Sequence, residues 1–173
     1  ATKNLACGEG GAVSTHDVRM GKLLRILRSH GITKEVASRH GTHQYMHYDM
    51  DRFGWKYNMD NIHASLLITQ MDRLKKYLVR RAEIDRMYRK AFANCGEIRM
   101  PDLMPGSRSA LHLFTVWVDP QKRDKILRYL NDNGIGAVVN YKPIHTLRYF
   151  KSEYGHKPGD YPAAERIGAS TIS

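Results

Sequence analysis

The feature that most constrains the fold is a long amphipathic segment in the middle of the chain, from Asp60 to about Ala93. Asp60 or Asn61 supplies an N-cap, and apolar residues recur three or four positions apart, which predicts one continuous helix. At about 1.5 Å per residue it would be roughly 50 Å long, more than one small core requires, so we expect it to connect two bodies. Its predicted apolar face consists of Leu67, Met71, Leu74, Leu78, Ile84, Tyr88 and Ala91.

Strand-like and helix-like patterns alternate on both sides of this helix, which is typical of an α/β fold. Before it, we expect a short strand over 11–15 and a helix that begins after Asp17, presents Leu23 and Leu27 inward, and stops near Gly31. The segment from Met100 to Ser109, rich in proline and glycine, reads as a linker. After it we expect strands over 112–118 and 136–140, helices over 121–133 and 148–154, and a helix from Ala163 to the last residue.

Composition places the chain among ordinary globular proteins, with 42% hydrophobic and 26% charged residues in 173. The formal net charge is +11, but the basic residues alternate with acidic ones along the helices, as on solvated helix faces. This favours anionic small molecules as partners, with no nucleic acid and no membrane. There is no apolar run of membrane-spanning length and no signal-peptide pattern, so we expect a cytoplasmic protein. Cys7 and Cys95 lack metal-ligand spacing.

The stretch from Ile32 to Tyr57 has no sustained periodicity and is rich in histidine and aromatic residues. His43 and His47 are four residues apart, but Gly41, which follows His40, interrupts the helix that such a metal site needs. We therefore expect no metal site. The aromatic content instead suits a subunit interface in a homodimer, formed by Tyr45, Met46, Tyr48, Phe53 and Trp55.

Lys3 is followed within eight residues by Gly8, Gly10 and Gly11. A lysine amine condenses with aldehydes to form a Schiff base, and a glycine-rich turn lets the backbone approach a bound group closely. On these residues alone, an exposed lysine near a chain end is the preferred explanation of the pattern.

Five motifs, in order and at compatible spacing, give the chain a resemblance to a known family. They are Ala1-Thr2-Lys3-Asn4 with Gly8-Glu9-Gly10-Gly11, Ser29-His30-Gly31, Gly54-Trp55-Lys56-Tyr57-Asn58-Met59, Gly134-Ile135-Gly136, and Tyr141-Lys142-Pro143-Ile144-His145. The chain resembles the DegT/DnrJ/EryC1/StrS sugar aminotransferases, which are pyridoxal-phosphate enzymes of fold type I. The resemblance implies the C-terminal portion of such an enzyme: the end of the large α/β domain with its interface loop (1–57), then a linking helix and a small α+β domain (58–173).

The activity implied by the resemblance is amino transfer from an amino acid such as glutamate to the keto group of a nucleotide-linked sugar. Lys3 would carry pyridoxal phosphate as a Schiff base and move a proton during transfer. Lys56 or Asn58 would contact the cofactor phosphate of the neighbouring subunit. Lys56 stands where many members carry asparagine, so either residue is a candidate.

Tyr141 and His145 match the family pattern and would line the substrate pocket, whereas Asn140 stands where many members carry histidine. For His145 the alternative is a loop histidine that bonds only to backbone. For the whole chain, one alternative is a catalytically inactive regulatory or scaffold homologue. Because some members that perform dehydration carry histidine at the position of Lys3, the lysine favours transamination. A basic nucleic-acid-binding module rests on charge alone.

Overall fold

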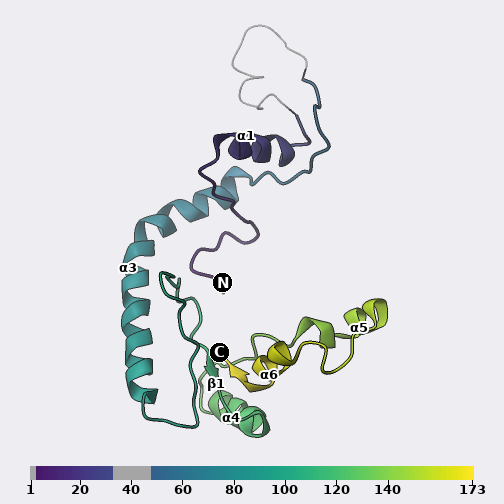
Figure 1. Ribbon diagram of the computed structural model, residues 1–173. Coiled ribbons are helices and arrows are strands. Elements are labelled where there is room, and N and C mark those ends of the chain that lie inside the picture. Colours follow the sequence, from purple (N-terminus) through teal and green to yellow (C-terminus); the bar gives the residue numbers. More distant parts are fainter. Residues whose placement is uncertain (1–2, 33–47) are drawn as a thin grey trace. The chain divides into compact units, whose positions relative to one another are not determined.

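The computed structural model describes residues 3–32 and 48–173 of the chain. They form two compact units, Ala1–Leu74 and Lys75–Ser173, and the boundary between the units falls inside one long helix. This helix is α3 (Asn61–Phe92), which runs unbroken through the boundary in Figure 1. The prediction of a long helix shared by two bodies is confirmed. The division of the complete fold after residue 57 stays a prediction.

In the first unit, helix α1 (Val18–Leu27) forms as expected. Asp17 is its N-cap, because the carboxylate accepts hydrogen bonds from the backbone nitrogens of Arg19 and Met20 at 2.7 and 3.2 Å. The strand expected over 11–15 is absent, and Val13 is 76% exposed. A strand needs a neighbour for its backbone N–H and C=O groups, and none of the described segments pairs with this one.

Asp60 caps the N-terminus of α3, because its Oδ1 accepts hydrogen bonds from Ile62 N and His63 N at 2.9 and 3.0 Å. Its covered side agrees only in part with the predicted apolar face. Leu67, Leu74 and Leu78 are half-buried as expected. Four other members of that predicted face are exposed: Met71, Ile84, Tyr88 and Ala91.

Three long polar side chains complete the covered stripe of α3, and each binds the backbone of another segment in its own unit. Gln70 does so in the first unit, as described below. In the second unit, Arg81 Nη1 donates to the carbonyl of Leu111 at 2.9 Å, and Arg89 Nη2 donates to the carbonyl of Pro101 at 3.2 Å. These two arginines therefore attach the segment that follows α3 to the helix. They do not lie on a purely solvated face, which is what the charge pattern suggested.

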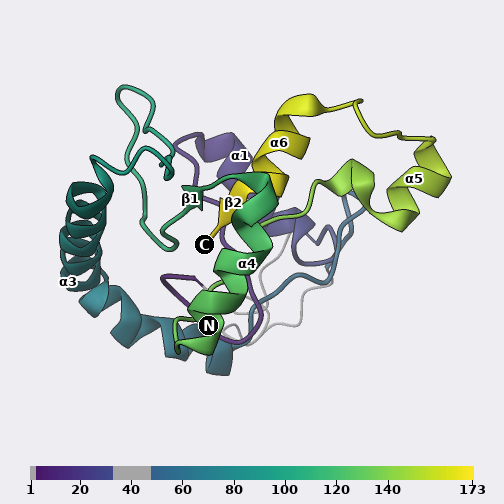
Figure 2. The ribbon, with the colours of Figure 1, turned by 90° about the horizontal axis from the view of Figure 1, so that it is seen from below.

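The core of the second unit is a small antiparallel sheet covered by one helix. Strand β1 (Val116–Trp117) pairs with β2 (Thr171–Ile172), and helix α4 (Pro120–Asp132) lies against them (Figure 2). Backbone hydrogen bonds extend the pairing from Trp117 to Arg99 on one side, and from Ser173 to Val138 on the other. The buried residues of this core are Val118, Ala137 and Ile172, with Ile98, Val116, Ile126, Leu127 and Leu130 packed around them.

The sheet is shorter than the sequence predicts, and the chain ends differently. The strand expected over 112–118 is reduced to β1, and that over 136–140 to the single pairing of Val138. Helix α6 (Pro162–Ser170) stops at Ser170, so the prediction of a helix to the last residue is wrong. Thr171 and Ile172, which are both β-branched, instead form strand β2 and pair with β1. Helices α4 and α5 (Arg148–Tyr154) agree with expectation, and a 3₁₀ turn, η1 (Ile144–Thr146), forms within a segment that the sequence did not predict to be helical.

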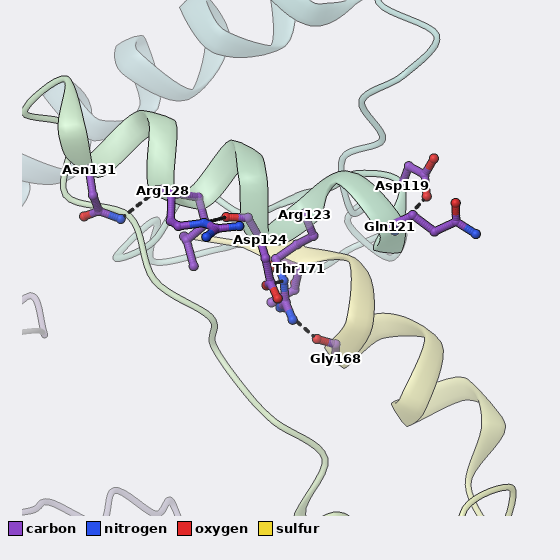
Figure 3. A network of polar contacts seen from close by, with 9 residues as sticks. Asp119, Gln121, Arg123, Asp124, Arg128, Asn131, Gly168 and Thr171 are labelled. Carbon is purple, nitrogen blue, oxygen red and sulfur yellow. Dashed lines mark hydrogen bonds and ion pairs between the residues drawn. The ribbon is translucent and has the colours of Figure 1, made fainter.

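Arg123 ties α4 to the end of α6, as Figure 3 shows. Its Nη1 donates to the carbonyl of Gly168 at 3.2 Å and lies 3.5 Å from that of Thr171, while its Nε bonds to Asp124 at 2.6 Å. A cation suits this place, because carbonyls at a helix C-terminus carry partial negative charge.

Within the described residues, no helix combines the length and the apolar character needed to cross a membrane.

Candidate functional site

The turn that carries Lys3 is attached to α3 by one side chain. Gln70 uses both ends of its amide: Oε1 accepts from the backbone nitrogen of Ala6 at 3.0 Å, and Nε2 donates to the carbonyl of Ala6 at 2.7 Å. Cys7, next in the chain, is 7% exposed. Lys3 itself is exposed. The backbone is thus fixed three residues after the lysine, while the amine stays accessible.

The glycines of this turn let it lie close to the beginning of α3. Gly8 has φ +86°, and a Cβ atom there would lie 3.2 Å from the ring of His63. A Cβ atom on Gly10 would lie 2.6 Å from Cε of Met59 and would collide with it. Gly8 is therefore required by the backbone of the turn, whereas a Cβ atom on Gly10 would meet the flexible end of Met59 and one on Gly11 would meet nothing within 4 Å.

The motif over 54–59 crosses the end of α1, where Gly54 faces Gly31. Trp55 N donates to the carbonyl of Leu27 at 2.7 Å, and His30 N donates to the carbonyl of Trp55 at 2.9 Å. A Cβ atom on Gly31 would lie 1.7 Å from the carbonyl oxygen of Arg52, so only glycine fits. The motif 29–31 and the motif 54–59, which are separate in the sequence, form one structure here.

Lys56 and Asn58 are exposed on this crossing segment. Lys56 forms an isolated antiparallel bridge with Ser29, and the rings beside it, Trp55 and Tyr57, are stacked with centroids 6.0 Å apart. The residues on either side of Lys56 are held to the end of α1, because Trp55 N and Tyr57 N donate to backbone carbonyls there, while the Lys56 side chain is exposed. Asn58 directly precedes Met59, the residue that packs against the lysine turn.

The predicted site residues fall into two sets. Lys3, Lys56 and Asn58 belong to the first unit, where the turn after Lys3 meets the residues that follow Asn58. Tyr141 and His145 belong to the second unit. Tyr45, Met46 and the three histidines of the rejected metal site lie outside the described residues. Over the described part of the chain, no group of three or more potential ligands is arranged to hold a metal ion.

His145 is buried, with 7% of its surface exposed. Its Nε2 lies 2.8 Å from Oε1 of Glu165, and its ring centroid lies 4.8 Å from that of Tyr161. The same carboxylate oxygen accepts a hydrogen bond from Gly159 N at 2.8 Å. Hydrogen bonds from His145 and then from the Gly159 backbone hold the pKa of the Glu165 carboxyl below its ordinary value, because both favour the charged form.

Sequence reasoning missed Gln70, which fixes the turn after Lys3, and Glu165, which bonds to His145. Gln70 had a signal: it stands three residues after Leu67 and four before Leu74, on the covered side of α3. A polar side chain at such a position must bond to something. Glu165 had no comparable signal, because its partner His145 is twenty residues away on a separate turn.

Comparison with known proteins shows the family of the chain. The model of the DegT/DnrJ/EryC1/StrS aminotransferase family matches residues 1–173. The spore coat polysaccharide biosynthesis protein SpsC of Bacillus subtilis is 33% identical over 178 residues, which cover 100% of this chain and 46% of that protein.

Two solved structures show the same fold. DesV of S. venezuelae matches 99% of this chain and 43% of its own length, with a TM-score of 0.82 and 28% identity. The PLP form of Spr1654, a putative sugar aminotransferase of Streptococcus pneumoniae, matches 94% of this chain and 39% of its own, with a TM-score of 0.74 and 30% identity. The chain spans less than half the length of each of these proteins. Its fold is that of part of these proteins, and it belongs to the DegT/DnrJ/EryC1/StrS aminotransferase family.

Proposed function

We propose that the protein is a pyridoxal-phosphate-dependent aminotransferase, which moves an amino group from an amino acid, glutamate in the first instance, to the keto group of a nucleotide-linked sugar. Such a reaction serves polysaccharide, lipopolysaccharide or antibiotic sugar biosynthesis. The family match over the whole chain supports amino transfer. The observation that carries the proposal is the fixed turn after Lys3, whose backbone Gln70 binds at both its donor and its acceptor.

The residues present fit pyridoxal phosphate. Lys3 and Lys56 are both exposed, so their amines are accessible to a bound group. Lys3 supplies an amine for the aldehyde, and Lys56 and Asn58 supply a cation and an amide donor for a phosphate dianion. The solved PLP form of Spr1654 supports the choice of cofactor.

When bound, the cofactor would act as an electron sink for the carbon that carries the amino group. The chain's own part falls to Lys3, whose Nζ would hold the cofactor at rest and, once released, carry a proton between donor carbon and cofactor carbon. Gln70 would hold the backbone of the turn after Lys3 in place through its two hydrogen bonds to Ala6. Tyr141, which is 71% exposed, would contact the acceptor sugar.

We propose further that the cytoplasmic enzyme is a homodimer, in which the loop of Lys56 faces the partner's cofactor. Tyr48, Phe53 and Trp55 are 53%, 76% and 45% exposed, and aromatic side chains exposed to this extent favour a covered surface. A two-fold interface would bury both copies at once. Light scattering on the full-length protein tests this: an active monomer would refute it.

The test of the activity is amino transfer by the full-length protein from L-glutamate to thymidine- or uridine-diphosphate-linked keto sugars, followed as 2-oxoglutarate release. The wild-type protein should turn over with at least one of these sugars, and Lys3→Ala should lose turnover. The remaining alternative, a catalytically inactive scaffold of the same fold, predicts assembly without any release of 2-oxoglutarate from the wild-type protein.

A further inference from the structure

Helix α6 holds the segment Tyr141–His145 at two points that lie three residues apart on one side of the helix. At the first, Glu165 Oε1 lies 2.8 Å from His145 Nε2, and the carboxylate accepts while the ring nitrogen donates. At the second, Gly168 is buried against Pro143: a Cβ atom on Gly168 would lie 2.5 Å from Cδ of that proline. We call Glu165 and Gly168 the α6 seat.

The two candidate substrate residues on this segment differ in what they offer a ligand. His145 is 7% exposed, and its Nε2 is engaged by the seat. Tyr141 is 71% exposed, while its carbonyl oxygen would lie 3.2 Å from a Cβ atom on Gly168. The backbone of Tyr141 is therefore next to the seat, and its side chain points away from the packed surface.

We propose that Glu165 and Gly168 are positioning residues which, through His145 and Pro143, place the Tyr141 side chain for the acceptor sugar. His145 then acts by fixing the segment and not by touching the sugar. This inference rests on the proposed function, in which Tyr141 contacts the sugar. It adds two residues that lie about twenty-five positions later in the chain, and it changes the role of His145.

Glu165 makes a second hydrogen bond, which links the α6 seat to the loop before α6. Oε1 of Glu165 also accepts a hydrogen bond from Gly159 N at 2.8 Å, so one atom joins α6, η1 and the loop before α6. A glutamine can still accept both hydrogen bonds with its amide oxygen, whereas alanine can accept neither. Glu165→Gln is therefore the conservative variant, and Glu165→Ala is the disruptive one.

The kinetic test separates the two half-reactions in the full-length protein. The first, with L-glutamate alone, does not involve the sugar. The second uses the thymidine- or uridine-diphosphate-linked keto sugar that the wild-type protein aminates. Glu165→Ala should raise the KM for that sugar about tenfold, the equivalent of one lost charge-assisted hydrogen bond, with kcat and the glutamate half-reaction within about twofold of wild type. Glu165→Gln should restore most of the KM.

Gly168→Ala tests the seat independently, because it disturbs Pro143 without removing any hydrogen bond. Alanine is the better helix former, so the helix itself should not suffer. The added methyl should nevertheless push the segment away and raise the sugar KM. Glu153→Ala, which removes an exposed carboxylate on α5, is the matched control and should leave the KM unchanged.

The double variant Tyr141→Phe with Glu165→Ala decides between positioning and general weakening. If the seat works through Tyr141, removing its hydroxyl should raise the KM about threefold to tenfold in the wild-type background and hardly at all when Glu165 is already alanine. Additive effects, an unchanged KM in both seat variants, or equal damage to the glutamate half-reaction would overturn the inference. A wild-type protein that fails even the glutamate half-reaction would instead overturn the proposed function on which it rests.

Discussion

Gly54 lies against Gly31 so closely that a Cβ atom on Gly54 would come within 2.2 Å of the backbone nitrogen of Gly31. This contact lets the segment of Trp55 and Lys56 cross the end of α1 and exchange backbone hydrogen bonds with it. Gly54→Ala should therefore destabilise the first unit by about 1–3 kcal/mol, because the backbone must shift to admit the methyl group. Urea unfolding of the full-length protein, followed by tryptophan fluorescence, measures this loss.

Gly96→Ala is the control for that experiment. A Cβ atom at Gly96 would meet nothing within 4 Å, so the change should stay within about 0.5 kcal/mol of wild type. Equal stability of the Gly54 and Gly96 variants would mean that the crossing segment does not need its facing glycines.

Arg123 should stabilise the second unit through its bonds to the end of α6. Its side chain is only 17% exposed, and Arg123→Met keeps much of the apolar stem while removing the donors to Gly168 and Thr171. We expect a loss of about 1.5 kcal/mol in the free energy of unfolding. Lys125→Met removes the same charge from an exposed position of α4 and should cost much less. Equal losses would show that only net charge matters.

The parts of the fold that were predictable from sequence are those set by local pattern. The bounds of α3, α4 and α5 follow from caps and helical periodicity that stand within a few residues of each other. The strands were less predictable, because a strand exists only where a distant segment pairs with it. Thr171 and Ile172 look like the end of a helix until β1, more than fifty residues earlier, provides a ladder.

In the candidate site, too, some residues were predictable from the sequence and others were not. The residues that resemblance pointed to, such as Lys3 and Lys56, are exposed and available for chemistry. The residues that hold them could not be predicted as readily, because each acts on a partner far away in the sequence. Gln70 binds the backbone of Ala6, and Glu165 binds His145.

The Glu165 carboxylate should make stability depend on acid pH. Hydrogen bonds from His145 and the Gly159 backbone lower its pKa in the folded state below the ordinary value of 4.5. A depressed pKa means that the stabilisation is complete above that ordinary value and is lost as pH falls through the lowered one. The difference in stability between wild type and Glu165→Gln should therefore shrink progressively as the pH falls below about 4.5.

Unfolding curves at a series of pH values check this difference, since carboxylates common to both proteins cancel. Glu153→Gln, at an exposed position of α5, should show no such pH-dependent gap. A gap for Glu165→Gln that stays the same or widens in acid would contradict the assigned hydrogen bonds.

Lys56 should serve the cofactor site of the partner subunit. Losing a charge-assisted contact to the phosphate should weaken cofactor affinity about ten- to a hundredfold in Lys56→Ala. A mixed dimer of one Lys3→Ala subunit and one Lys56→Ala subunit locates the effect. If Lys56 acts across the interface, the one site that retains Lys3 receives an intact Lys56 from its partner and binds the cofactor normally. Weakened binding in that mixed dimer would place Lys56 in its own subunit's site.

The attachment of pyridoxal phosphate to Lys3 is tested most directly by borohydride reduction of the full-length protein followed by peptide mass spectrometry. The visible absorbance of the lysine-bound cofactor should disappear on reduction, and the label should be found on Lys3. Lys3→Ala should show neither the absorbance nor the label, while Lys56→Ala should still be labelled on Lys3. A label on a different lysine, together with undiminished amino transfer by Lys3→Ala, would contradict the account.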